Sequence, residues 1–307
     1  KGLWIIGEDI VQTDPNSNHV IDAMKALDLL VVQEIFMSET AKYADVVLPG
    51  TTFLEKDGTF TNTERRVQRV NKAAEPLPGT KPDGVIVTDM MQRLGYDQKT
   101  YDADEVLAEI ADVVPFFKGI TRERLGKMGL QWPVQEDGTD TKILHEKEFK
   151  LGKGRLKYFH WKESAEISEN KKEYPLILTT SRVLQHYNAA TMTRRTNNID
   201  IVDEDILLVH PNDAKYRELN TGDIARLYSG RGEVALKVEV TDKVKEGIVF
   251  TTFHFPEHMV NMVTGYGKDE ETKCAEYKIS SVEVQKISNK FKTDHYPEGN
   301  EAEVTQN

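Results

Sequence analysis

The chain has only one cysteine, Cys274, among its 307 residues. A lone thiol cannot form an internal disulfide, and it cannot hold an iron–sulfur cluster, which needs about four thiolates. We interpret Cys274 as a structural or merely tolerated thiol. No apolar run approaches the ~20 residues that a membrane span needs, and no secretory signal precedes the apolar run at residues 3–6. These absences predict a protein without a membrane span, and we expect it to be cytoplasmic.

The motifs of several enzyme classes are also absent. There is no G-x-G-x-x-G fingerprint, no G-x-S-x-G elbow and no His/Cys cluster. We therefore assign no nicotinamide site, no hydrolytic triad and no zinc site to this chain. The net charge of -11 argues against nucleic acid as the main partner.

The patterns that are present begin with a βαβ unit. Residues 3–7 form an apolar run ending in glycine, which predicts a buried parallel strand. Residues 15–27 have helical spacing, and residues 29–32 and 44–49 predict two more strands. Helical patterns return at residues 85–94 and 103–113. This order predicts an α/β domain with three layers, similar to dinucleotide-binding domains, over residues 1–114.

The second half has a β pattern. Short apolar runs, each bounded by a turn signal, recur at about ten-residue spacing between residues 174 and 290, which predicts a closed barrel of about six strands. We interpret residues 115–173 as a connecting segment, although the apolar residues at 130–133 predict that part of it packs. Residues 291–307 are polar and predict a disordered tail.

Several long motifs resemble the molybdopterin oxidoreductases. Residues 31–36, 39–41, 44–49 and 55–66 resemble the third domain of that family, and residues 191–195, 253–254 and 276–278 resemble its terminal barrel domain. Gly7, Glu8 and Asp9 followed by Thr13 and Asp14 resemble the formate dehydrogenase branch. The resemblance covers roughly residues 4–287, in the order that the family has.

The resemblance implies a function and a cofactor. It identifies the chain as the carboxyl-terminal half of a formate dehydrogenase catalytic subunit, with a barrel of the double-psi type. The implied cofactor is bis(molybdopterin guanine dinucleotide) carrying molybdenum or tungsten, and the full-length activity is the oxidation of formate to carbon dioxide and two electrons. The alternatives are another superfamily member, such as a nitrate reductase, and a metal-free relative, such as the large iron–sulfur subunit of respiratory complex I.

The resemblance also implies what lies elsewhere. The family's amino-terminal half carries the 4Fe-4S cluster, the metal-ligating cysteine or selenocysteine, and the catalytic histidine and arginine, and none of these motifs is in this sequence. The resemblance therefore implies that this chain holds no catalytic residue and no metal ligand and is inactive alone. Because the chain begins with Lys1 almost inside a strand, we also expect it to be a fragment. The implied partners are the pterin cofactor, that amino-terminal half and an electron-transfer subunit.

The cofactor residues that the resemblance implies fall into two groups. Gly7, Asp9, Thr13 and Gln33 follow the first two strands, where ligands lie in open α/β sheets, and they match nucleotide contacts. Asp83 matches an aspartate that accepts hydrogen bonds from guanine, although on sequence alone it would be interpreted as a helix N-cap. Most relatives follow this aspartate with tryptophan, whereas this chain has Gly84. In the barrel, the matching residues are Arg182, His186, Tyr187, Tyr277 and Lys278.

Overall fold

The chain folds into two compact units, each of which combines separate stretches of sequence. A computed structural model describes residues 1–158, 160–265, 267–269 and 271–287. The first unit contains residues 1–8, 29–37 and the described residues from 44 to 160; the second contains residues 9–28, 38–43 and the described residues from 161 onward. The predicted domain boundaries after residues 114, 173 and 290 stay a prediction, and the predicted tail at 291–307 lies outside the described residues.

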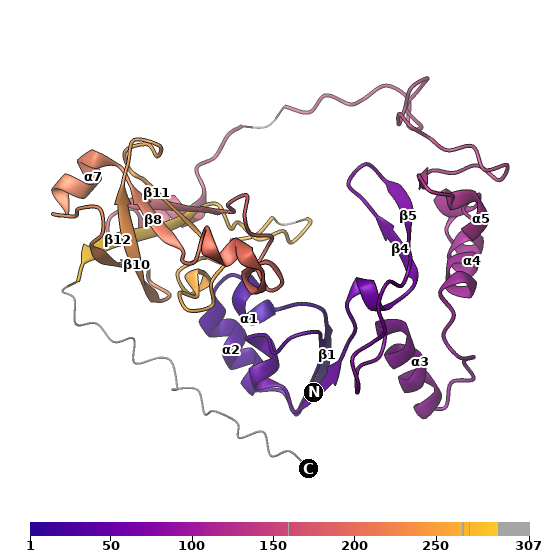
Figure 1. The fold of residues 1–307 in the computed structure, drawn as a ribbon. Coiled ribbons are helices and arrows are strands. Elements are labelled where there is room, and N and C mark those ends of the chain that lie inside the picture. The colour runs from indigo at the N-terminus through magenta and orange to yellow at the C-terminus, as the bar shows by residue number, and fades with distance from the viewer. Residues whose placement is uncertain (159, 266, 270, 288–307) are drawn as a thin grey trace, which may run out of the picture. The chain divides into compact units, whose positions relative to one another are not determined.

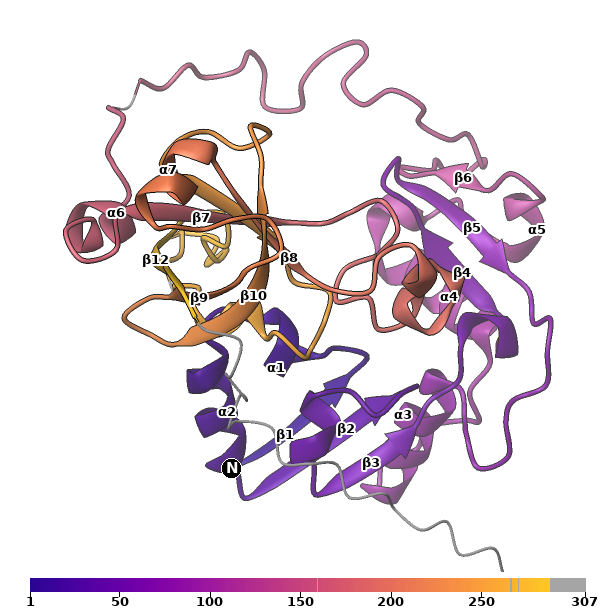
Figure 2. The same cartoon turned by 60° about the vertical axis from the view of Figure 1, so that its left-hand side comes forward.

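The first unit contains a three-stranded parallel sheet in the order β1-β2-β3 (Figure 2). The strands are β1 (Gly2–Ile6), β2 (Leu29–Glu34) and β3 (Val46–Pro49). Ile6 pairs with Gln33 and Gln33 pairs with Leu48, so the carboxyl ends of the strands are in register. A bridge between Gly50 and Lys81 brings the chain back beside the end of β3, just before the helix α3 (Asp83–Arg93).

The rest of the first unit is built around an antiparallel sheet in the order β4-β5-β6 (Figure 2). Its elements are η2 (Phe53–Glu55), β4 (Gly58–Thr61), β5 (Arg66–Val70), α4 (Ala103–Val113), η3 (Pro115–Phe117), α5 (Arg122–Leu125) and β6 (Leu130–Gln131). Its core is formed by Val67, Leu107, Ile120, Leu125 and Val134, with Trp132 packed against it. Part of the predicted connecting segment therefore contributes to this core, whereas residues 142–158 contain no helix or strand (Figure 1).

The second unit is a closed six-stranded barrel in the order β10-β8-β11-β7-β12-β9 (Figure 1). Its strands are β7 (Leu176–Ser181), β8 (Ile206–Val209), β9 (Ile224–Tyr228), β10 (Glu233–Val240), β11 (Ile248–Thr252) and β12 (Ser280–Lys286). The β7·β11 and β8·β10 pairs are parallel and the other four are antiparallel. Alternate residues of each strand point into one apolar core that includes Leu178, Leu207, Leu227 and Leu236. The predicted α/β sheet and barrel are thus confirmed.

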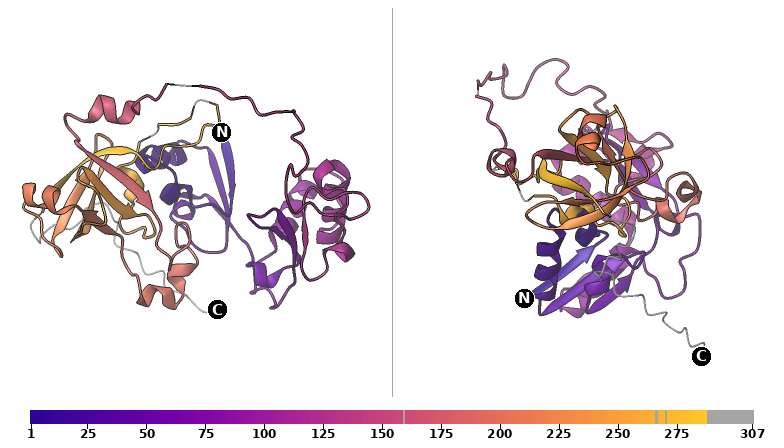
Figure 3. Two further views of the ribbon diagram at one scale, coloured as in Figure 1. Left: turned by 90° about the horizontal axis from the view of Figure 1, so that it is seen from above. Right: turned by 90° about the vertical axis from the view of Figure 1, so that its left-hand side faces the viewer.

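Short helices belong to the same unit as the barrel, and three of them come from the first 43 residues of the chain. They are α1 (Ile10–Thr13), α2 (Ser17–Lys25), η1 (Thr40–Tyr43), α6 (Ala165–Asn170), η4 (Thr193–Arg195), η5 (Asn197–Asp200), α7 (Pro211–Tyr216) and η6 (Val260–Met262). Figure 3 shows α1 and α2, in indigo, beside the barrel strands in both views. Buried Gln12 attaches α1, because its Nε2 donates to the carbonyl oxygens of Ala189, Phe253 and His254.

No helix among the described residues is long and apolar enough to cross a membrane.

Candidate functional site

In the first unit, polar side chains gather where β2 and β3 end. Gly7 has a φ of 65°, a left-handed conformation that favours glycine, and its N–H donates to the Gln33 carbonyl oxygen at 2.9 Å. Gln33 is buried, and its Nε2 donates to Asp83 Oδ1 at 2.7 Å. Lys56 Nζ forms an ion pair with Asp83 Oδ2 and also donates to the Thr51 carbonyl oxygen at 3.2 Å. The fold therefore joins segments that are far apart in sequence into one polar cluster.

The Asp83 carboxyl is held in its charged form. Desolvation alone would raise its pKa, but the hydrogen bonds from Lys56 and Gln33 outweigh that effect, so the pKa lies below its ordinary value. Pro82 takes the N-cap position of α3, and Asp83 is the first helical residue. The helix-cap interpretation of Asp83 is therefore wrong, and its carboxylate binds side chains instead. Because an ionised carboxylate only accepts hydrogen bonds, the amide nitrogen of Gln33 must face it.

Two buried oxygens of this cluster have no hydrogen-bond partner in the described part of the chain. They are Gln33 Oε1 and Thr51 Oγ1. A buried polar atom without a partner costs about 1–3 kcal/mol, so such atoms indicate a group that completes them. Beside them Gly50 leaves room for the carboxylate, because a Cβ at this position would lie 3.1 Å from Asp83 Oδ1. The cluster thus offers oxygen acceptors, and the glycine lets another group come close to the backbone. Oxygen acceptors fit the hydrogen-bond donors on the edge of a guanine base.

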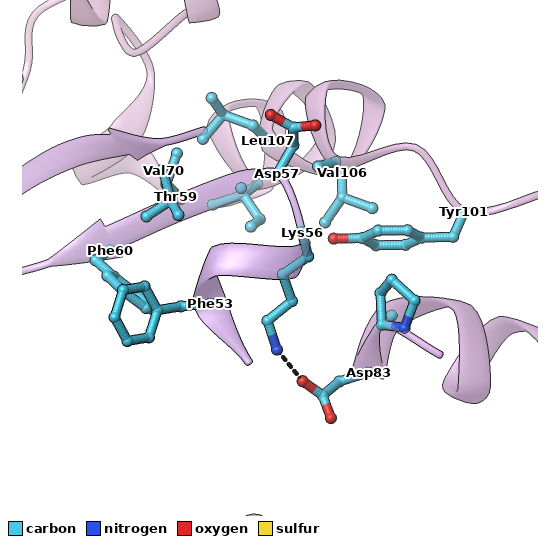
Figure 4. Close-up of a pocket in the computed structure, with 15 residues that line it drawn as sticks. Phe53, Lys56, Asp57, Thr59, Phe60, Val70, Asp83, Tyr101, Val106 and Leu107 are labelled. Carbon is cyan, nitrogen blue, oxygen red and sulfur yellow. Dashed lines mark hydrogen bonds and ion pairs between the residues drawn. The ribbon is translucent and has the colours of Figure 1, made fainter. Parts of the chain in front are cut away.

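A cavity of about 230 Å³ adjoins this cluster (Figure 4). Lys56 and Asp83 line one side of it, and aromatic and aliphatic side chains line the rest, among them Phe53, Phe60 and Tyr101. Sequence reasoning assigned no role to Lys56 or Tyr101. No local signal distinguishes them, because Lys56 lies 27 residues before Asp83 in the chain.

In the second unit, Asp9 and Thr13 lie at the two ends of α1. Asp9 is buried, and its carboxylate accepts hydrogen bonds from Thr40 N at 2.9 Å, Thr40 Oγ1 at 2.8 Å and Glu39 N at 3.2 Å. It thus anchors η1 within the unit. Thr13 is half-buried, and its carbonyl oxygen accepts a hydrogen bond from Asn261 Nδ2 at 3.1 Å. The nucleotide contacts inferred for Asp9 and Thr13 stay predictions.

Two cations with aromatic neighbours lie at the end of β7. The Arg182 guanidinium lies 5.9 Å from the centre of the exposed Tyr187 ring. Lys278 Nζ donates to the Thr180 carbonyl oxygen and lies 5.9 Å from the Phe253 ring centre. Desolvation lowers the pKa of Lys278, and the charge of Arg182 lowers it further. Two cations this close favour an anion such as a phosphate.

Tyr277 and His186 are tied into the barrel unit. The Tyr277 carbonyl oxygen accepts a hydrogen bond from Thr180 Oγ1 at 3.0 Å. His186 is buried, with Nδ1 3.0 Å from Thr193 Oγ1 and Nε2 2.8 Å from the Val202 carbonyl oxygen. Since both ring nitrogens have partners within the unit, the structure gives His186 a role in holding the loop after β7. Its inferred contact with the cofactor stays a prediction.

His254 supports the same loop. Its Nδ1–H donates to the Asn188 carbonyl oxygen at 2.7 Å, and its Nε2 accepts from Val183 N at 3.1 Å, so the ring is neutral. Burial lowers the pKa of His254, with the Asp205 carboxylate opposing this effect. The loop that carries Arg182 is thus held by a buried imidazole.

Comparison with known proteins gives the class. A family model described as "Molybdopterin oxidoreductase" matches residues 1–93, and one described as "Molydopterin dinucleotide binding domain" matches residues 176–281. Together with the sheet and the closed barrel, these matches show that the chain belongs to the molybdopterin oxidoreductase family.

Its curated relatives include formate dehydrogenases. The chain is 43% identical over 293 residues to the F420-dependent formate dehydrogenase subunit alpha of Methanocaldococcus jannaschii, and 43% identical to the F420-dependent formate dehydrogenase 2 subunit alpha of Methanococcus maripaludis. Each match covers 94% of this chain and 43% of the relative, so the chain spans less than half the length of these proteins. The acetylene hydratase of Pelobacter acetylenicus shares the fold, with a TM-score of 0.69 at 21% identity over 94% of this chain and 44% of the hydratase.

Proposed function

We propose that this chain is the cofactor-holding, carboxyl-terminal part of a formate dehydrogenase catalytic subunit. The cofactor would be a bis(molybdopterin guanine dinucleotide) with molybdenum or tungsten. The observation that carries the proposal is the Asp83 carboxylate, kept charged by Gln33 and Lys56 beside two buried oxygens without partners. The identity to formate dehydrogenase subunits supports formate as the substrate of the full-length protein.

The chain's own residues would bind and orient the cofactor. Asp83 accepts hydrogen bonds from the base, because guanine presents adjacent N–H donors that match a carboxylate. Gln33 holds that carboxylate in place. Arg182 and Lys278 supply positive charge for a phosphate or the pterin. When bound, the cofactor supplies the metal centre for the redox chemistry, while the protein supplies orientation and electrostatics.

The polar cluster also bears on the alternatives. A metal-free structural relative has no need for a charged carboxylate beside buried acceptors that cost stability, so the cluster favours a cofactor-binding member. A nitrate reductase would use the same contacts, and only substrate turnover separates it from a formate dehydrogenase. The amino-terminal half, with its 4Fe-4S cluster, and an electron-transfer subunit complete the proposed enzyme.

The test uses the full-length protein, purified from a host that makes the pterin cofactor. We expect two bound pterins for each metal ion, formate-dependent reduction of an oxidised dye, and no nitrate-dependent oxidation of a reduced dye. The 307-residue chain expressed alone should show no formate-dependent dye reduction. Absence of pterin from the full-length protein would reject the proposal, and nitrate turnover without formate oxidation would move it to the nitrate reductase alternative.

A further inference from the structure

The cavity beside Asp83 has a size and lining that the polar cluster alone does not explain. Its volume of about 230 Å³ is below the roughly 300–1,000 Å³ of pockets for drug-sized ligands, so it suits one ring system rather than a whole dinucleotide. Phe53, Phe60 and Tyr101 contribute aromatic surface, and Lys56 and Asp83 contribute charge on one side. This combination of flat apolar walls and one charged edge fits a heteroaromatic base.

Gly84 and Tyr101 form a steric pair in the wall of this cavity. A Cβ at Gly84 would lie 2.6 Å from Tyr101 Cδ2 and closer still to Cε2 and Cζ, so the Tyr101 ring occupies the space of a side chain at position 84. Gly84 lies in α3, where glycine costs about 0.5–1 kcal/mol relative to alanine. The close approach of the ring gives a physical reason for a glycine at this position.

The Tyr101 ring is therefore fixed against Gly84, which follows Asp83 in the first turn of α3. Figure 4 shows its hydroxyl pointing into the cavity, toward the side of Lys56 and Val106. Desolvation raises the pKa of Tyr101, and the charges of Asp102 and Asp83 raise it further, so the hydroxyl stays protonated at neutral pH. The side chain presents an uncharged aromatic surface with a hydrogen-bonding tip.

We propose that Tyr101 is the aromatic wall of the subsite for the purine base, and that Gly84 is required to admit it. This inference rests on the proposed function, since it assumes that Asp83 accepts hydrogen bonds from the base. The edge of the base would be recognised by the Asp83 carboxylate and its face by the Tyr101 ring. Every base has a π-face, so the ring adds affinity, whereas the carboxylate selects guanine.

The experiment measures binding of GMP and of ribose 5-phosphate to cofactor-free full-length protein by calorimetry. We expect Tyr101→Ala to weaken GMP binding by roughly tenfold, the effect of losing one aromatic stacking partner, and to leave ribose 5-phosphate binding unchanged. Tyr101→Phe should retain GMP binding within about threefold because the ring remains. Tyr101→Leu keeps apolar bulk against Gly84, so it should fold even if Tyr101→Ala folds poorly. Because it also lacks the ring, it should weaken GMP binding to the same extent. Tyr96→Ala is the matched control, since Tyr96 is exposed and does not line the cavity.

Three results would overturn the inference, and they are distinguishable. If Tyr101→Ala and Tyr101→Leu bind GMP as tightly as the wild type while Asp83→Asn does not, Tyr101 is no part of the subsite and the proposed function stands. If the wild type binds no GMP, the proposed guanine site fails together with the inference. Equal loss of GMP and ribose 5-phosphate binding in both Tyr101 variants would also reject a role at the base.

Discussion

Gln33 Nε2 donates a 2.7 Å hydrogen bond to Asp83 Oδ1 across 50 residues of sequence. This bond determines how both side chains are oriented. The Gln33 amide nitrogen is used, which leaves its buried Oε1 without a partner in the described part of the chain. The Asp83 carboxylate is fixed beside the cavity, so a ligand meets it without reorganisation, and a preorganised group loses less entropy on binding.

We expect Asp83→Asn to reduce retention of the guanine-dinucleotide cofactor in the full-length protein. Loss of a charged acceptor that faces two donors should cost about 1.5–3 kcal/mol of binding free energy. The measurement is pterin and GMP content after purification. Asp89→Asn is the matched control, because Asp89 lies on the same helix and pairs with Lys81 at 2.6 Å. Cofactor content equal to the wild type in Asp83→Asn would remove Asp83 from the site.

Lys56→Met should raise the pKa of the Asp83 carboxyl. The Lys56 hydrogen bond and charge are among the causes that hold this pKa below its ordinary value, so their removal leaves desolvation less opposed. With its folded-state pKa lowered, Asp83 stabilises the wild-type fold above its unfolded pKa, and this contribution is lost as pH falls through the folded value. In Lys56→Met this contribution should be smaller, because the folded-state pKa lies closer to the unfolded one. Carbon-detected NMR titration measures the pKa directly, with Lys81→Met as the control.

Gly84→Ala should destabilise the protein, although alanine is normally the better helix residue. The added methyl group would overlap the Tyr101 ring, and overpacking of this kind costs about 1–3 kcal/mol. In the double variant Gly84→Ala/Tyr101→Ala the cost should disappear, because the ring is gone. Urea unfolding measures both. Gly58→Ala is the control, since a Cβ there meets nothing within 4 Å. Additive effects of the two substitutions would contradict the steric pair.

His254 should make the stability of the barrel unit depend on pH. Burial lowers its pKa, so the unfolded state binds a proton more readily than the folded state does. Stability therefore rises with pH through the range below the unfolded value of ~6.5 and is fully present above it. Replacement by glutamine should flatten this part of the profile, whereas replacement of the exposed His19 should not. If the stability of His254→Gln depends on pH as strongly as that of the wild type, other groups cause the dependence.

Arg182→Gln should weaken binding of pyrophosphate to the cofactor-free full-length protein. Loss of one charge-assisted hydrogen bond, worth about 1.5–3 kcal/mol, corresponds to roughly tenfold or more in affinity. Calorimetry at two salt concentrations measures it, and the salt dependence should decrease because one cation is lost. Arg226→Gln is the matched control, since Arg226 also lies over a tyrosine, Tyr228, at 4.2 Å. An equal effect of both variants would indicate only a change in net charge.

Sequence alone determined the elements and the family. The apolar run at residues 29–32 lies in β2, where it buries Leu30 and Val32. The patterns at 85–94 and 103–113 predicted α3 and α4 to within two residues. Long motifs determined the resemblance to molybdopterin oxidoreductases, which the comparisons confirmed. The strands β5 and β6 were not predicted, because β5 has only two apolar residues among its five and β6 is only two residues long.

Only the tertiary structure decided how the site is assembled. Whether Asp83 caps its helix or binds Gln33 and Lys56 depends on partners 50 and 27 residues away, and no local pattern contains them. The same holds for Gly84, whose meaning depends on the Tyr101 ring that packs against it. Local propensity acts within a few residues, whereas hydrogen bonds and steric exclusion act between whichever segments the fold brings together.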